Sequence, residues 1–338
     1  MSERADRVVI HASGKALHGD FSADREPVVT IEPGDAVRLS TLDSWWSAGP
    51  DQGGRFPERP RVAEYIEGAG HALTGPIAVR GARPGMTLEV RIDALVPAGW
   101  GTCVAGGWQS ALNERYGIVD DGVIHTWTLD AEAMLARNQH GHTVALRPFL
   151  GVIGMPPPEP GQHSTIPPRR FGGNLDCREL VAGSTLFLPI GVDGGLLSVG
   201  DGHGVQGDGE VTGTAIERPM DRADLTVGLR DDIPIDGPVA RTPAGWIALV
   251  PGGHAGRCRI LGDGGHDRAA RSAARLGPAH LDRAVQRSRG PAGHPDGQPG
   301  GGRARGSGAG CDPVGARAPA AGGRLRSSVV VPMAGGRR

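Results

Sequence analysis

The chain has 338 residues, of which 57 are glycine and 28 are proline, so a quarter of them favour turns over regular helices. No stretch approaches the ~20 uncharged apolar residues of a membrane-spanning helix, and the glycines lack the three-residue period of collagen. Four scattered cysteines do not form a disulfide framework. Because the N-terminus also lacks a secretory signal, we expect a cytoplasmic protein without a membrane partner.

The formal net charge of −1 conceals two unlike parts. Residues 251–338 contain 15 arginines and 5 aspartates, whereas the first 250 residues are mildly acidic. An acidic surface argues against nucleic acid as a partner.

Most of the first 250 residues are predicted to form β-strands. Residues 36–42 and 86–92 alternate apolar and polar side chains with period two, and Pro-Gly or Gly-rich turns separate such segments. The predicted strands are 27–32, 36–42, 77–80, 86–92, 184–190 and 196–199. Residues 130–137 could form two helical turns. We therefore expect a mainly β fold, a jelly-roll-like sandwich or barrel with short helices, over residues 1–250. It forms either one domain or two β subdomains that meet near residues 97–147.

Ligand-type side chains are densest between residues 201 and 210. Asp201 and His203 are two residues apart, so an extended backbone would direct both to one face, and Asp208 and Glu210 share that spacing. Imidazole and carboxylate ligands together suit zinc. The interleaved glycines at 200, 202, 204, 207 and 209 make sense if the backbone must approach a ligand closely. The alternative is a glycine-rich turn with solvated acids.

Other candidate residues stand alone in the sequence. Asp176 follows a proline-rich loop, and His71 and His163 are the best separate histidines, although a lone histidine is more often structural. Cys177 is a candidate nucleophile without an evident base. Lys15 is the only lysine, which disfavours amidase mechanisms that require a catalytic lysine, and no G-x-S-x-G or H-E-x-x-H motif occurs.

Several long segments resemble the acetamidase/formamidase family. The most specific are residues 70–91, 149–153, 164–188 and 198–219, and the resemblance extends over roughly residues 8–247. It implies a mainly β fold, usually in dimers or larger assemblies, and hydrolysis of short linear amides such as formamide or acetamide to carboxylate and ammonia.

The resemblance also implies roles for individual residues. A divalent metal ion, zinc with calcium as the alternative, would be held by His71, Asp176, Asp201, His203 and Asp208. Glu210, Glu217 and Asp43 are the expected catalytic acids, with Glu210 or Glu217 passing the proton to departing ammonia. The competing hypothesis is a non-catalytic calcium-binding β-module that presents a sugar or a protein.

The resemblance stops after Ile247, where the composition changes abruptly. Glycine, arginine, alanine and proline make up 59 of the last 88 residues, which is what an out-of-frame reading of a GC-rich gene yields. A natural, disordered basic tail is the alternative. We expect residues 251–338 to be out of frame and unstructured. The chain would then be an inactive, frameshifted amidase, and an intact C-terminus would be needed for a homodimer.

Overall fold

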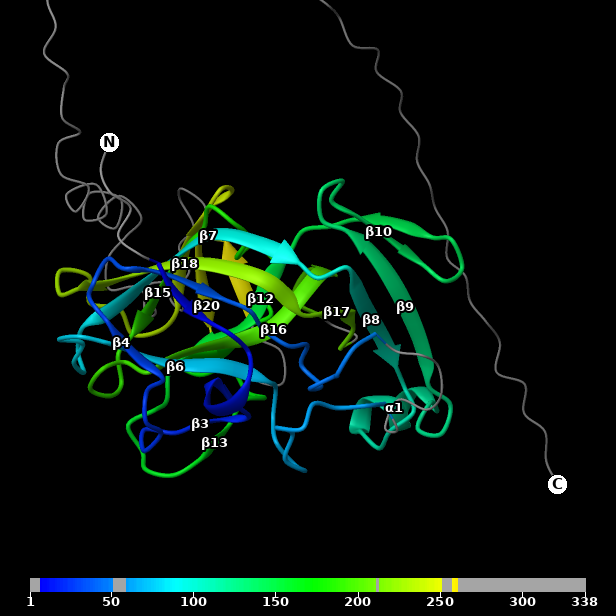
Figure 1. The fold of residues 1–338 in the computed structure, drawn as a ribbon, viewed down its shortest axis with the longest axis horizontal. Helices are drawn as coiled ribbons and strands as arrows, with labels where there is room; N and C mark the ends of the chain where they lie inside the picture. Colours follow the sequence, from blue (N-terminus) through cyan, green and yellow to red (C-terminus); the bar gives the residue numbers. More distant parts are fainter. Residues whose placement is uncertain (1–6, 51–58, 211–212, 251–256, 261–338) are drawn as a thin grey trace, which may run out of the picture. The chain divides into compact units, whose positions relative to one another are not determined.

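The computed structural model describes residues 7–50, 59–210, 213–250 and 257–260, and it confirms a mainly β fold with few short helices (Figure 1). One sheet has eight strands, all antiparallel except for the β1–β5 pair. Its strands, in spatial order, are β1 (Val8–Ile10), β5 (Ala36–Leu39), β18 (Met220–Arg230), β7 (Thr87–Pro97), β15 (Thr185–Pro189), β19 (Val239–Thr242), β20 (Gly245–Val250) and β21 (Arg257–Ile260).

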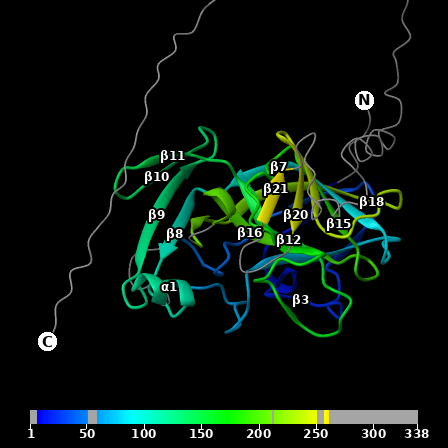
Figure 2. The ribbon, with the colours of Figure 1, turned by 180° about the vertical axis from the view of Figure 1, so that it is seen from behind.

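The second sheet has eleven strands, and β16 occupies its centre. Along its main path the strands are β11 (Thr143–Ala145), β10 (Leu135–Asn138), β9 (Val123–Asp130), β8 (Trp100–Ala105), β17 (Ala215–Glu217), β16 (Leu197–Gln206), β12 (Phe149–Gly154) and β14 (Gly172–Asn174). The other three are β6 (Leu73–Val79), which pairs with β16, and its neighbours β2 (Leu17–His18) and β4 (Val29–Ile31). A separate pair joins β3 (Asp20–Phe21) to β13 (His163–Ser164). Figure 2 shows β8–β11 side by side at one end of this sheet.

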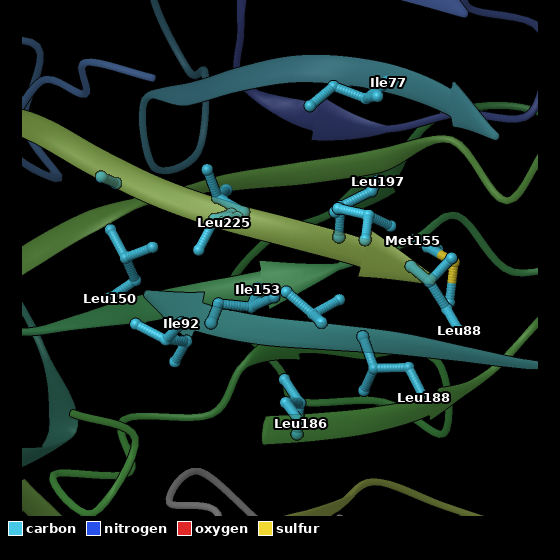
Figure 3. Packing of buried hydrophobic residues seen from close by; sticks show 14 of the residues in the cluster. Ile77, Leu88, Ile92, Leu150, Ile153, Met155, Leu186, Leu188, Leu197 and Leu225 are labelled. Atoms are coloured by element: carbon cyan, nitrogen blue, oxygen red, sulfur yellow. The ribbon is translucent and has the colours of Figure 1, made fainter. Parts of the chain in front are cut away.

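The two sheets pack face to face as a sandwich. Leu88 and Ile92 of β7 belong to the same buried hydrophobic cluster as Leu150 of β12 and Leu197 of β16 (Figure 3). Strand β7 shows why the sequence predicted it, because Leu88, Val90 and Ile92 point inward at every second position. This core supports β16 and its functional side chains.

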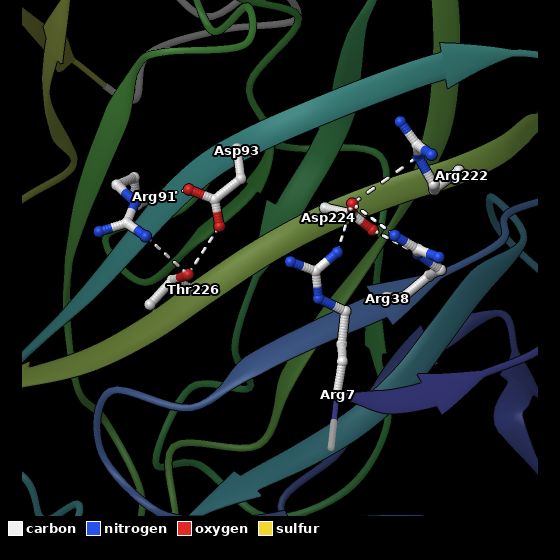
Figure 4. A network of polar contacts seen from close by, with 7 residues as sticks. All are labelled: Arg7, Arg38, Arg91, Asp93, Arg222, Asp224 and Thr226. Carbon is white, nitrogen blue, oxygen red and sulfur yellow. Dashed lines mark hydrogen bonds and ion pairs between the residues drawn. The ribbon is translucent and has the colours of Figure 1, made fainter. Parts of the chain in front are cut away.

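The outer face of the first sheet is polar. Asp224 on β18 binds the guanidinium groups of Arg7 and Arg38 at 2.6 and 2.7 Å, and Arg222 lies 3.7 Å away (Figure 4). Beside it, Asp93 of β7 accepts from Arg91 and from the hydroxyl of Thr226. The alternation along β7 and β18 therefore leaves one apolar face and one charged face.

Helices are short in the described residues. The helix α1 (Ala111–Tyr116) begins where the Ser110 hydroxyl accepts from the Asn113 amide, and it ends at left-handed Gly117. The other helical turns are η1 (Gly14–Ala16) and η3 (Asp208–Glu210). None of the described helices has the length and apolar character needed to span a bilayer.

The helix suggested for residues 130–137 is wrong. The Asp130 carboxylate accepts from the amides of Glu132 and Ala133 and makes a turn, after which β10 pairs back along β9. The side-chain hydrogen bonds of Asp130 outcompete a helix here.

The tail predicted to be unstructured lies almost entirely outside the described residues. Within it, the structure describes β21, which pairs antiparallel with β20, so the sheet continues past residue 250.

Candidate functional site

His203 on β16 lies between two carboxylates. Its Nε2 is 3.3 Å from Asp201 Oδ1 and 3.3 Å from Glu217 Oε2, and all three side chains are buried. Asp201 comes from the same strand, whereas Glu217 reaches the site because β17 pairs with β16 in a register that sets it opposite His203. Two adjacent strands thus gather one imidazole and two acids.

A hydrogen-bond chain fixes the imidazole of His203. Its Nδ1 lies 2.7 Å from Oε1 of Gln206, whose Nε2 donates to the backbone carbonyl of Asp176. Since the amide of Gln206 uses its donor end on that carbonyl, its oxygen faces the ring, and Nδ1 must carry the proton. Nε2 is therefore the nitrogen available to a cation or a proton. Phe149 packs edge-on against the ring at 4.9 Å between centroids.

Asp176, just after β14, completes one side of the cluster. Ligand atoms of Asp176, Asp201 and His203 lie within 4.8 Å of one another. The backbone carbonyl of Gly151 on β12 accepts from the Asp176 amide, and a Cβ at Gly151 would lie 2.4 Å from Asp201 Oδ2 and 2.8 Å from Asp176 Oδ1. Only glycine at this position lets both carboxylates approach the strand.

Glu210 and Ser44 complete the cluster, and the carboxyl group of Glu210 also interacts with that of Asp176. Glu210, from η3, forms a second group with His203 and Glu217, whose ligand atoms also lie within 4.8 Å of one another. The hydroxyl of Ser44 donates to Glu217 Oε2 at 3.1 Å. Glu210 is partly exposed, so this side of the cluster faces solvent.

Asp43 and His71 lie close enough to Asp201 to feel its charge. Asp43 is fully buried and its Oδ1 accepts from the Ser47 amide, and the charge of Asp201 also acts on it. His71 is partly exposed, its Nδ1 lies 2.8 Å from the Thr165 hydroxyl, and it interacts electrostatically with Asp201. Of the residues expected from the sequence, Asp43, His71, Asp176, Asp201, His203, Glu210 and Glu217 therefore gather in one region.

The structure does not bring Asp208 into the cluster. Its side chain is 83% exposed and faces Arg178 at 3.9 Å, because residues 208–210 form the turn η3 and not the extended strand that their spacing suggested. His163 hydrogen-bonds the carbonyl of Glu159 at the surface, and Cys177 is buried in the hydrophobic core.

The glycines of β16 serve the packing of strands. A Cβ at Gly200 would lie 2.2 Å from the Ala72 carbonyl, and one at Gly202 would lie 2.5 Å from the Arg218 carbonyl. The close approach that the sequence suggested is therefore to neighbouring backbone. At Gly207 and Gly209, no described atom lies within 4 Å of an added Cβ.

Burial raises the pKa of two of the acids, Glu217 and Asp176, but not that of Asp201. It raises the pKa of Glu217 to about 8, although the charge of His203 acts in the opposite direction. Burial, and then the charge of Asp201, raise the pKa of Asp176 well above its ordinary value. Burial alone would also raise the pKa of Asp201, but the charge and hydrogen bond of His203 outweigh it and lower that pKa. Two neighbouring acids thus differ in protonation near neutral pH, as in acid–base catalysis.

The charge balance of the cluster fits a bound cation. Four carboxyl groups, from Asp176, Asp201, Glu210 and Glu217, surround the single imidazole of His203. Oδ1 of Asp176 is buried without a hydrogen-bond partner among the described residues. Since buried carboxylates require compensation, a divalent ion would satisfy both the excess charge and this oxygen.

Comparison with known proteins identifies the family. The model of the acetamidase/formamidase family matches residues 6–162 and 159–239. The chain belongs to this family. A formamidase from Methylophilus methylotrophus is 28% identical over 268 residues, which cover 64% of this chain and 64% of that protein. An acetamidase from Mycolicibacterium smegmatis is 28% identical over 257 residues, which cover 57% and 61%. The chain thus spans less than two thirds of the length of these relatives.

A solved structure of the family has the same fold. The crystal structure of an acetamidase from Bacillus halodurans superposes with a TM-score of 0.61 at 25% identity, and it covers 70% of this chain and 75% of its own. The chain therefore shares the fold of this acetamidase.

Sequence reasoning missed three positioning residues. Gln206 is three residues beyond His203, Ser44 adjoins Asp43, and Gly151 lies in a segment already noted for its resemblance. A glutamine or serine close in sequence to a candidate ligand could have indicated Gln206 and Ser44. A metal-binding histidine usually donates a hydrogen bond from its second ring nitrogen to a nearby oxygen. Gly151 could not be found this way, since its role depends on the pairing of β12 with β16.

Proposed function

We propose that this protein hydrolyses the C–N bond of short linear amides such as formamide and acetamide, giving a carboxylate and ammonia. The observation that carries the proposal is the buried His203 held between Asp201 and Glu217 in a chain of the acetamidase/formamidase family. Such a chain of acid, imidazole and acid suits a reaction that must move protons in a site largely shielded from water.

The acids divide the proton transfers between them. Glu217 is the acid proposed to protonate the departing nitrogen, because it is buried 3.3 Å from Nε2 of His203 and its burial, in the absence of a metal ion, raises its pKa to about 8. Glu210, on the partly exposed side, can exchange that proton with solvent. Asp43 is a positioning residue, since its contact with the Ser47 amide holds the loop from which Ser44 donates to Glu217.

The donor set fits a divalent metal ion, for which we propose zinc. His203 through Nε2, Asp201 and Asp176 would hold it, with Glu210 as a further candidate ligand. When bound, such an ion supplies a Lewis acid for the amide carbonyl and a water of lowered pKa. His203 belongs to both ligand groups, and this nitrogen favours zinc over calcium, which prefers oxygen ligands alone.

Ammonia release from formamide and acetamide, before and after treatment with a chelator, tests the proposal. We expect release by the metal-loaded protein, loss after chelation, and recovery with Zn²⁺ but not with Ca²⁺. Folded, metal-loaded protein that releases no ammonia from any short amide would refute the activity. Recovery with Ca²⁺ alone, together with no hydrolysis, would instead support the calcium-binding module.

A further inference from the structure

Three histidines gather at the far end of the second sheet, on strands that the proposed reaction does not use. His125 lies on β9, and His140 and His142 lie on the turn between β10 and β11 (Figure 1). The ring centroids of His125 and His140 are 5.4 Å apart, and those of His140 and His142 are 6.5 Å apart. His125 is partly exposed and the other two are exposed, so solutes can reach the group.

The turn that carries two of these histidines is held in place by its own side chains. Oδ1 of Asn138 accepts from the backbone amides of both His140 and His142, at 3.1 and 2.9 Å. Gly141 between them has φ +87°, a conformation that glycine adopts without strain. The two histidines are therefore presented by an ordered turn.

Gln139 fastens this turn to the strand of the third histidine. Its Oε1 accepts from the amide of Thr126 at 3.0 Å, and its Nε2 donates to the carbonyl of Ile124 at 2.9 Å. These two partners flank His125 in the chain. The three rings are consequently placed by backbone hydrogen bonds, which reduces the entropy lost when they share a ligand.

The imidazole rings have nitrogens that could bind a metal ion. Nδ1 of His125 is buried and has no hydrogen-bond partner among the described residues. Among the described residues, His140 and His142 are hydrogen-bonded through their backbones, by both amides and by the carbonyl of His142, and not through their rings. The rings of His125 and His140 meet edge to face at 81°, and those of His140 and His142 are tilted by 56°.

The rings can reach a shared metal ion after their exposed side chains rotate; as they stand, the three do not form a group whose ligand atoms all lie within 4.8 Å of one another. A Zn–N bond of about 2.0–2.1 Å sets the ion roughly 3.2 Å from a ring centroid, so two rings in tetrahedral positions have centroids about 5.2 Å apart. The His125–His140 distance of 5.4 Å is close to this value, and the His140–His142 distance of 6.5 Å would have to shorten by about 1.3 Å, which requires rotation of these exposed side chains.

We propose that His125, His140 and His142 form a metal site, separate from the cluster around His203, for a late first-row divalent ion such as Zn²⁺, Ni²⁺ or Cu²⁺. Imidazole is the preferred ligand of these ions, and three histidines leave a further position for water. The ion joins the turn after β10 to β9 and stiffens the end of the sheet.

Zinc titration of the full-length, chelator-treated protein tests the site, with a coloured chelator as competitor. His140→Ala/His142→Ala should bind one equivalent of Zn²⁺ fewer than the wild type, or bind it at least 100-fold more weakly. His11→Ala removes an exposed histidine elsewhere and should bind as the wild type does. Both altered residues of the double variant are exposed, and a far-UV circular dichroism spectrum checks that the fold is retained.

A second variant, Asp201→Asn, separates metal binding at the three histidines from metal binding at the cluster around His203. Asp201→Asn should still bind Cu²⁺ with a paramagnetic resonance spectrum that shows several nitrogen ligands, and the added His140→Ala/His142→Ala pair should abolish that spectrum. Equal stoichiometry and affinity in the wild type and the double variant would overturn the proposal, as would complete loss of the nitrogen-ligand spectrum in Asp201→Asn alone.

Discussion

Replacing Gly151 with alanine tests the geometry of the site more directly than removing a ligand does. The added Cβ would lie 2.4 Å from Asp201 Oδ2 and 2.8 Å from Asp176 Oδ1, and neither residue changes its chemistry. Since ordinary contacts begin near 3.4 Å, the Asp201 carboxylate must retreat by about 1 Å. A displacement of about 1 Å in a catalytic arrangement reduces the rate by roughly 100-fold.

The measurement compares Gly151→Ala with Gly207→Ala, which lies beyond the end of β16. No described atom lies within 4 Å of a Cβ added at Gly207, so this control should keep wild-type activity. We expect kcat/KM for ammonia release from formamide to fall about 100-fold in Gly151→Ala. Bound metal should fall with it, while the circular dichroism spectrum stays unchanged. Full activity and full metal content in folded Gly151→Ala would refute the placement of Asp176 and Asp201.

Three further predictions concern other side chains. Asp201→Asn should lose the metal equivalent bound at His203 and with it amide hydrolysis, whereas Asp208→Asn should lose neither, because Asp208 faces solvent beside Arg178; metal analysis and ammonia release check both. The hydrogen bond from Arg38 lowers the pKa of Asp224, so this acid stabilises the fold above its unfolded pKa of 3.8 and less as the pH falls further. Urea denaturation should therefore show that Asp224→Asn costs about 1–2 kcal/mol at pH 7 and less at pH 3. In metal-free protein, burial raises the pKa of Glu217 from 4.5 to about 8, so the wild type loses stability as the pH rises between these values. As the pH rises from 4.5 to about 8, the melting temperature of Glu217→Gln should increase relative to that of the wild type. A difference in melting temperature that stays constant over this pH range would contradict the prediction.

Local patterns in the sequence identified the framework well. Period-two alternation predicted residues 86–92, which lie within β7, and the apolar run 184–190 contains β15. The first pattern is readable because one face of β7 is buried, and the second because β15 is buried on both faces and is therefore a continuous apolar run. The helix at 130–137 failed for a local reason also, since the turn formed by Asp130 stops a helix that composition alone allows.

The sequence alone could predict contacts in the site only between residues that are close together in the chain. Asp201 and His203 come together as their spacing suggested, whereas the same spacing failed for Asp208 and Glu210 because a helical turn follows β16. Glu217 contacts His203 through the register of two strands, and no sequence pattern states that register. The resemblance supplied Glu217, and the pairing of β16 with β17 supplies the physical reason for its place.

The backbone at the site departs from what stability alone would favour. Asp176, Asp201 and Glu210 have φ values of +43°, +56° and +46°, in the left-handed region that costs a residue other than glycine about 1 kcal/mol or more. All three residues are acidic, and the fold brings their carboxyl groups close together. Repulsion between these like charges adds to the backbone strain. A chain selected only for stability would place glycine or asparagine at such positions. The sheet core, in which β16 is paired with β6, β12 and β17, is what can hold these acids in strained conformations, and a cation or a shared proton relieves their repulsion. Strain and buried charge therefore converge on the same residues as the proposed chemistry.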